Sequence, residues 1–95
     1  MPKKRRQMVQ EARKNMNKII EKKILPEYFD AVFYGDKKFE IRKDEDDIQV
    51  GDILRLWEWD GYKRTGGAID KKVSYVLRDK PEYGLQRGYC IIGWR

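Results

Sequence analysis

The sequence contains no histidine and only one cysteine among its 95 residues. The absence of histidine removes the most common general base and the most common metal ligand. With a single cysteine as well, a zinc site of the ordinary type is excluded, and we expect no metal. Cys90 cannot form an intramolecular disulfide, which agrees with a reducing compartment. It lies in the apolar run 89–92, where we expect a buried thiol rather than a nucleophile.

Long apolar segments are also missing. No run approaches the length of a membrane span, and none resembles the apolar core of a signal peptide. We therefore expect a cytoplasmic protein with no membrane partner. Neither a glycine-rich phosphate loop nor a dinucleotide-binding fingerprint is present, so no cofactor is expected. The acidic run 44–47 lacks the spacing of a calcium loop and predicts a surface loop.

The positive charge of the chain is concentrated at its N-terminus. The net charge is +6 overall, but residues 1–23 carry nine lysines and arginines against two glutamates. The remaining residues are nearly neutral, with thirteen basic and fourteen acidic side chains. Such asymmetry is typical of an arm that contacts nucleic acid, although a solvated helix is an alternative. The predicted contact residues of the arm are Lys3, Lys4, Arg5, Arg6, Arg13 and Lys14.

The arm leads into an amphipathic pattern over residues 7–22. Met8, Ala12, Met16, Ile19 and Ile20 recur at spacings of three and four, opposite a basic face. This pattern predicts a helix that packs on the rest of the chain or on a partner. A protein partner or a homodimer through residues 8–20 is therefore one hypothesis. We divide the chain into this basic arm and helix, 1–22, and one small domain, 23–95.

The domain reads as about five short strands with one internal helix. A helix is expected from Pro26 to Tyr34, because proline is favoured in a first turn and Gly35 suits a helix end. The region after Asp60 reads as a glycine-rich connection to residue 67, and Val73, Tyr75 and Leu77 should share one side of a strand. The fold class is α+β, with the strands forming a small mixed barrel, closed or nearly so. The expected strands are 23–25, a strand after Gly35 that runs to about residue 43, 53–59, 69–77 and 89–94.

The segment Gly35–Arg42 is the most informative in the chain. Phe39 and Ile41 alternate with charged residues, so they are expected to face the core. Lys38, Glu40 and Arg42 would then share the opposite face, with Lys37 just before them. Spacing alone leaves two interpretations open, a polar binding site and a solvated strand face with paired charges.

This octapeptide, Gly-Asp-Lys-Lys-Phe-Glu-Ile-Arg, resembles the G-x-K-x-x-E-x-R motif of the ASCH domains in the PUA-like superfamily. Residues 23–32, 49–54 and 57–60 resemble a small subgroup of undefined function from phages and bacteria. The resemblance implies a PUA-like β-barrel with flanking helices, to which the basic N-terminal helix would be an addition. It also implies a ligand cleft near the motif and binding of RNA or a nucleotide.

The resemblance implies a non-catalytic site at the motif. Arg42 and Lys37 could hold a phosphate or carboxylate, while Glu40 could orient Lys37 or accept a hydrogen bond from a base. Nearby aromatic side chains could stack on unpaired bases, although tryptophans on strands are usually core residues. The predicted ligand-binding residues are Lys37, Glu40, Arg42, Gly35, Lys23, Tyr28, Trp57 and Trp59.

An enzyme is the alternative. A related ASCH branch hydrolyses acetylcytidine and uses a lysine and a threonine nucleophile at this motif. Lys37 matches the lysine, but Glu40 stands in place of the threonine, and a carboxylate cannot simply replace an activated hydroxyl. An amidohydrolase acting on acylated nucleosides, with Lys37 and Glu40 as its catalytic residues, is thus a less favoured hypothesis.

Overall fold

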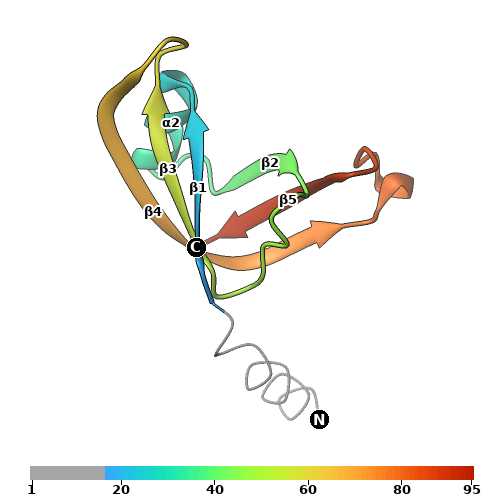
Figure 1. Cartoon of the computed structure of the whole chain (residues 1–95). Coiled ribbons are helices and arrows are strands. Elements are labelled where there is room, and N and C mark those ends of the chain that lie inside the picture. The colour runs from blue at the N-terminus through green and yellow to red at the C-terminus, as the bar shows by residue number, and fades with distance from the viewer. Residues whose placement is uncertain (1–16) are drawn as a thin grey trace.

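The computed structural model describes residues 17–95 as one five-stranded mixed sheet with a single α-helix (Figure 1). The strand order is β1-β3-β4-β5-β2, with β1 and β3 parallel and the other neighbours antiparallel. No helix within this part of the chain is long and apolar enough to cross a membrane. The elements are β1 (Ile19–Ile24), α2 (Pro26–Phe33), β2 (Phe39–Lys43), β3 (Ile53–Trp59), β4 (Arg64–Arg78), a 3-10 turn (Pro81–Tyr83) and β5 (Tyr89–Trp94).

The first strand begins earlier than predicted. Residues 19–22, which the sequence pattern assigned to a helix, belong to β1, so that part of the prediction is wrong. Ile20 and Ile24 are buried while Ile19 and Lys23 are exposed, an alternation of period two that suits β-branched residues in a strand. β1 pairs along its whole length with β3. Residues 7–16 of the predicted helix lie outside the described residues.

The helix α2 confirms the sequence prediction at both ends. Pro26 occupies its first turn, and Gly35 follows it with a φ of 82°, a conformation that favours glycine. Within the helix, the side chain of Val32 is fully buried. Phe29 lies so close to Gly67 that a Cβ at that glycine would be 3.1 Å from the ring. The helix therefore packs against β4 at Gly67, a position that carries no side chain.

The strand β4 is longer and less regular than predicted. It starts at Arg64, so the turn that joins it to β3 spans only residues 60–63, and Gly66 and Gly67 lie inside the strand. Its first half pairs with β3 and its second half with β5. A register irregularity between Val73 and Tyr75 leaves Val73 buried and Tyr75 64% exposed. The prediction that these two residues share one side is therefore wrong, because the bulge interrupts the alternation.

The sheet is not closed into a barrel, which corrects the predicted architecture. β1 and β2 are its two edge strands, and they do not pair with each other. A side chain connects them instead, since the guanidinium of Arg42 on β2 donates to the backbone oxygen of Lys23 on β1 at 2.6 Å. The alternating pattern of the strands could not distinguish such an open sheet from a barrel, because both bury one face of every strand.

The core lies between the two halves of the sheet. Leu54 and Leu56 on β3 and Ile92 on β5 are fully buried. Trp94 and Cys90 extend this core along β5, where every second residue is buried. The buried cluster consists of Ile20, Ile24, Val32, Ile48, Leu54, Leu56, Val73, Cys90, Ile92 and Trp94.

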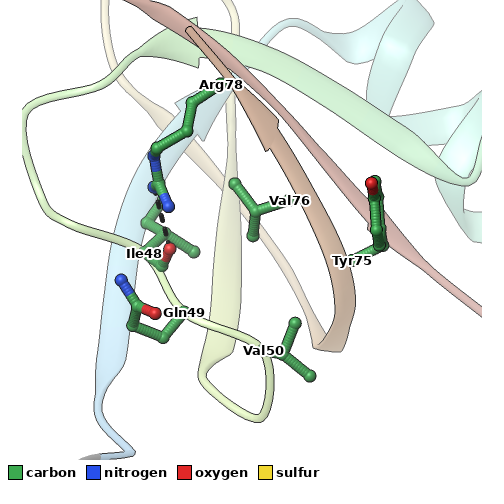
Figure 2. A pocket seen from close by; sticks show the side chains of 6 residues that line it. All are labelled: Ile48, Gln49, Val50, Tyr75, Val76 and Arg78. Atoms are coloured by element: carbon green, nitrogen blue, oxygen red, sulfur yellow. Dashed lines mark hydrogen bonds between the residues drawn. The ribbon is translucent and has the colours of Figure 1, made fainter. Parts of the chain in front are cut away.

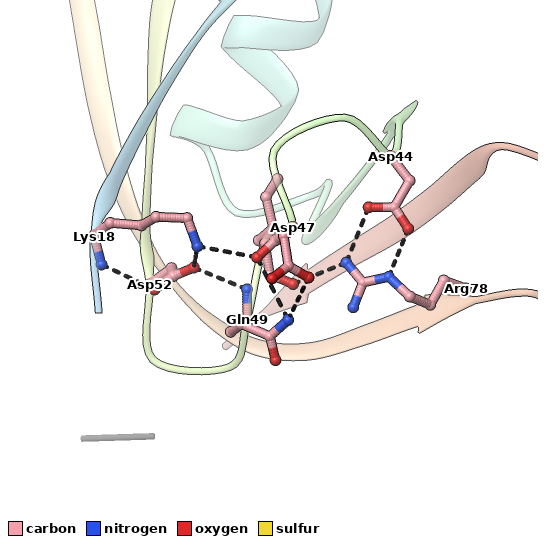
Figure 3. A network of polar contacts seen from close by, with 7 residues as sticks. Lys18, Asp44, Asp47, Gln49, Asp52 and Arg78 are labelled. Carbon is pink, nitrogen blue, oxygen red and sulfur yellow. Dashed lines mark hydrogen bonds and ion pairs between the residues drawn. The ribbon is translucent and has the colours of Figure 1, made fainter. Parts of the chain in front are cut away.

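A polar network holds the loop between β2 and β3 against the sheet (Figure 3). Asp52 is fully buried and accepts hydrogen bonds from the backbone and side chain of Lys18 and from the backbone of Gln49. Burial alone would raise the pKa of Asp52, but these donors outweigh it and leave the pKa below its ordinary value. Arg78 closes the other end of the loop with two hydrogen bonds to Asp44 and one to the oxygen of Ile48.

Candidate functional site

The strand β2 is oriented opposite to the prediction. Glu40 is only 5% exposed, whereas Phe39 and Ile41 are 45% and 53% exposed. The expectation that the two apolar residues face the core is therefore wrong. A buried carboxylate is costly unless it is paired with cations, and here two cations accompany it. Those pairs make the inverted orientation possible.

The motif residues Lys37, Glu40 and Arg42 form one ion-paired cluster. Lys37 Nζ donates to Glu40 Oε1, and Arg42 Nε and Nη2 lie 2.8 and 2.7 Å from Glu40 Oε2. The side chains of Lys37 and Arg42 keep 18% and 25% of their surface exposed. Two cations around one carboxylate leave the cluster with a formal charge of +1. We call these three residues the motif cluster.

The segment between α2 and β2 fixes where Lys37 lies. The backbone N–H groups of Asp36 and Lys37 both donate to the carbonyl of Ala31 at 2.9 Å, so the chain turns tightly at the helix end. Gly35 makes this turn possible through its positive φ, and it offers no side chain to a ligand. The carbonyl of Lys38 then accepts from Trp94 N, which ties the segment to the end of β5.

Two aromatic rings flank the cluster on its exposed side. Lys37 Nζ lies 5.4 Å from the ring centre of Tyr28 and 5.3 Å from that of Phe39. Both rings are nearly half exposed. Tyr28 was among the predicted site residues, but Phe39 was missed because its alternation with charged neighbours indicated a core position. The general preference of cations for aromatic faces is the physical signal that would have grouped Phe39 with Lys37.

Trp57 and Trp59 lie away from the motif cluster, on the face of β3 opposite to buried Leu54 and Leu56. Trp57 donates to Glu21 at 2.7 Å, and Arg64 lies 4.2 Å from its ring centre. The ring of Trp59 lies 4.0 Å from Lys23 Nζ. These contacts group the two tryptophans with Lys23 and Arg64 rather than with Lys37.

Lys23 contacts both regions through different atoms. Its carbonyl oxygen accepts from Arg42 of the motif cluster, whereas its ammonium group lies over Trp59. The predicted site residues therefore separate into two groups, which meet at the edge strand β1. The predicted contact residues of the basic arm, residues 3–14, lie outside the described part of the chain.

The model of one protein family matches residues 19–94, from the first residue of β1 to the last of β5. That family is described as a domain of unknown function, DUF3850. The chain belongs to this family. The DUF3850 domain is also 38% identical over 61 residues to the "Uncharacterized 12.9 kDa protein in GpA 3′ region" of Escherichia phage P2. The match covers 64% of the chain and 56% of that phage protein, so it spans about half of the relative's length.

The DUF3850 domain has a small pocket whose lining includes no residue of the motif cluster. Figure 2 shows the side chains that line it. It has a volume of about 160 Å³ where the loop before β3 meets the second half of β4. Arg78 is its only charged side chain, and it is already held by Asp44 and the oxygen of Ile48. The pocket is lined by Ile48, Gln49, Val50, Tyr75, Val76 and Arg78, none of which was a predicted site residue.

The thiol of Cys90 lies in the core of the DUF3850 domain. Cys90 is fully buried, and burial raises the pKa of its thiol above the ordinary value. The thiolate, which is the nucleophilic form, is thereby disfavoured. The predicted burial of the Cys90 thiol is confirmed.

Proposed function

We propose that this DUF3850 domain binds RNA or a nucleotide-containing ligand at the motif cluster without catalysing a reaction. The observation that carries the proposal is the combination of Lys37 and Arg42 around buried Glu40 with the exposed rings of Tyr28 and Phe39. A nucleotide presents both an anionic phosphate and an aromatic base. The cluster offers a partner of each kind within one small area.

The charges of the cluster support an anionic ligand. Glu40 neutralises one of the two cations and holds both in place, so one formal positive charge remains for a phosphate. Arg42 has five N–H donors, and the contacts with Glu40 and Lys23 leave its Nη1 group for a ligand. Lys37 likewise has donors beyond the one that contacts Glu40.

The rings support recognition of an unpaired base. Tyr28 and Phe39 lie on different elements, α2 and β2, and both approach Lys37. Stacking of a base on such rings is typical of proteins that bind single-stranded RNA. The resemblance to ASCH domains favours the same ligand class, and the proposal includes a PUA-like relationship of the fold. The basic arm would add salt-sensitive contacts to phosphates.

The test is a fluorescence-anisotropy titration of a labelled single-stranded RNA with wild type and Arg42→Ala. We expect Arg42→Ala to lose most of its affinity at physiological salt, because the variant removes the Nη1 donor and one of the two cations of the cluster. Arg87→Ala is the matched control, since it removes the same charge from an exposed position before β5. Thermal unfolding of each variant shows whether it is folded. A folded Arg42→Ala protein with wild-type affinity would remove Arg42 from the site.

A further inference from the structure

A second surface has the composition of a nucleic-acid contact, and it lies on the opposite side of β3 from the core. We call it the tryptophan face. It is formed by the outer side of β1, β3 and the first half of β4, together with the turn between β3 and β4. Its members are Lys23, Trp57, Trp59, Tyr62, Lys63 and Arg64.

The aromatic residues of this face lie outside the buried core cluster. The register of β3 against β4 is irregular between Trp57 and Trp59, but contacts with β1 place both rings on the outer side. Trp57 donates to Glu21 and Trp59 lies under Lys23, and residues two apart on β1 share one side. Both tryptophans are partly exposed. Tyr62 is 90% exposed in the turn between β3 and β4, and it adds a third ring to this hairpin. Part of each tryptophan and almost all of Tyr62 are therefore accessible to a ligand.

The cations of the face are held over rings instead of by carboxylates. Lys23 lies over Trp59 and Arg64 over Trp57. Among residues 17–95, none of Lys23, Lys63 and Arg64 forms a salt bridge. Their ammonium and guanidinium groups are therefore not engaged in ion pairs with the described residues, so an anionic partner can contact them.

The two nearby carboxylates accept hydrogen bonds from neutral N–H groups. Asp60 accepts hydrogen bonds from the backbone N–H groups of Tyr62 and Lys63 at 2.8 and 2.9 Å, and so holds the turn in shape. Glu21 accepts from the indole of Trp57. The hydrogen bonds to Asp60 thus fix the backbone of the turn that carries Tyr62 and Lys63.

We propose that the tryptophan face binds single-stranded nucleic acid, with the rings stacking on bases and Lys23, Lys63 and Arg64 contacting phosphates. Base faces are accessible only in unpaired strands, so a duplex would use the cations but not the rings. This second site is inferred from contacts other than those of the motif cluster, and it extends the proposed function. Because Lys23 contacts both regions, a single strand that leaves the motif cluster over the edge of β1 would reach this face.

The test follows the fluorescence of the intact protein during titration with oligouridine at physiological salt. Trp57 and Trp59 are partly exposed while Trp94 is 5% exposed, so quenching by stacked bases reports mainly on this face. We expect saturable quenching by oligouridine and by oligothymidine, and much weaker quenching by a duplex of equal length. Tyr62→Ala should weaken the binding about tenfold, in the range measured for loss of one stacked base.

The controls separate this proposal from the proposed function. Arg64→Ala should weaken the quenching more than Arg87→Ala, which removes the same charge elsewhere. Arg42→Ala should weaken the overall RNA affinity measured by anisotropy but keep saturable quenching at higher oligouridine concentrations, because the quenching reports on the tryptophan face. Since Tyr62 is almost fully exposed, its substitution tests the face without the risk of unfolding.

Three outcomes would overturn the proposal. The first is the absence of quenching, and the second is quenching that Tyr62→Ala leaves unchanged. The third is equal quenching by polyglutamate or by vesicles with anionic headgroups, which would make the face a general acceptor of negative charge.

Discussion

At the scale of single residues, Glu40 explains the arrangement of the motif. A strand that buries a carboxylate and exposes phenylalanine and isoleucine is stable only if the charge is compensated, and Lys37 and Arg42 both compensate it. The cluster therefore has a structural role whether or not it binds a ligand. The effect of any substitution in the cluster on binding must therefore be compared with its effect on folding.

Glu40→Gln should destabilise the fold by about 2 kcal/mol. Removal of one partner of a buried ion pair typically costs about 3–5 kcal/mol, and the partial exposure of Lys37 and Arg42 reduces that loss. Urea denaturation measures the change. Asp70→Asn is the control, because it breaks the exposed pair with Arg55 and should cause a clearly smaller loss. Equal losses in the two variants would contradict a special role for Glu40.

The sequence predicted which residues form the cluster but not the side of β2 on which they lie. Apolar and charged residues alternate along β2, and such alternation normally identifies the buried face by its apolar members. The rule failed at Phe39 and Ile41 because Glu40 has two cations within reach, which a pattern of single residues does not record. The tryptophans are a different case. Both sides of β3 are partly apolar, so the alternation did not predict which side faces the core.

At the scale of elements, α2 and β5 were predictable from local signals, whereas β1 was not. Pro26 and Gly35 mark the ends of the helix within the sequence itself. In β1, Ile19 and Ile20 fit a helical stripe as well as a strand, and the pairing with β3 decides between the two. That pairing joins residues more than thirty positions apart, so no local pattern contains it.

The loop before β3 should make stability depend on acid. Asp52 has a lowered pKa in the folded state, so it binds fewer protons there than in the unfolded chain. Its contribution is fully present above its ordinary pKa of 3.8 and is lost as the pH falls through the lower folded value. The free energy of unfolding, measured by urea between about pH 2 and pH 6, should therefore fall less steeply in Asp52→Asn than in wild type.

Part of the acid dependence should survive in Asp52→Asn, because other carboxylates also have lowered pKa values. Hydrogen bonds from Arg55 lower the pKa of Asp70, and backbone donors lower that of Asp60. A variant curve that runs parallel to that of wild type over the whole range would show that Asp52 does not contribute in this way.

At the scale of the whole molecule, an open sheet has two edge strands whose backbone groups need protection. β1 and β2 approach each other through Arg42 and the carbonyl of Lys23, which satisfies one edge group without strand pairing. Composition and strand count could predict a small mixed sheet, but closure depends on whether the last pair of edges forms backbone hydrogen bonds. In this molecule a side chain occupies that place, and the barrel stays open.

The open sheet also changes how the basic arm can be tested. Removal of residues 1–22 would delete most of β1, whereas a chain that begins at Asn17 keeps β1 and the contacts of Lys18 with Asp52. We expect that shorter chain to bind single-stranded RNA with a weaker dependence on salt than the full chain. Each phosphate contact contributes about 0.7 to the slope of log K against log salt, so the six basic residues of the arm account for at most about 4.

The comparison of slopes separates the arm from the folded domain. If both chains are monomers by light scattering, a smaller slope with Arg42-dependent binding retained would assign the salt-sensitive contacts to the arm and the specific ones to the motif cluster. An unchanged slope would mean that residues 1–16 do not contact phosphate. A full chain that dimerises and a shorter one that does not would instead support the hypothesis of a protein interface through residues 8–20. The motif cluster and the tryptophan face would then have to bind RNA without help from the arm.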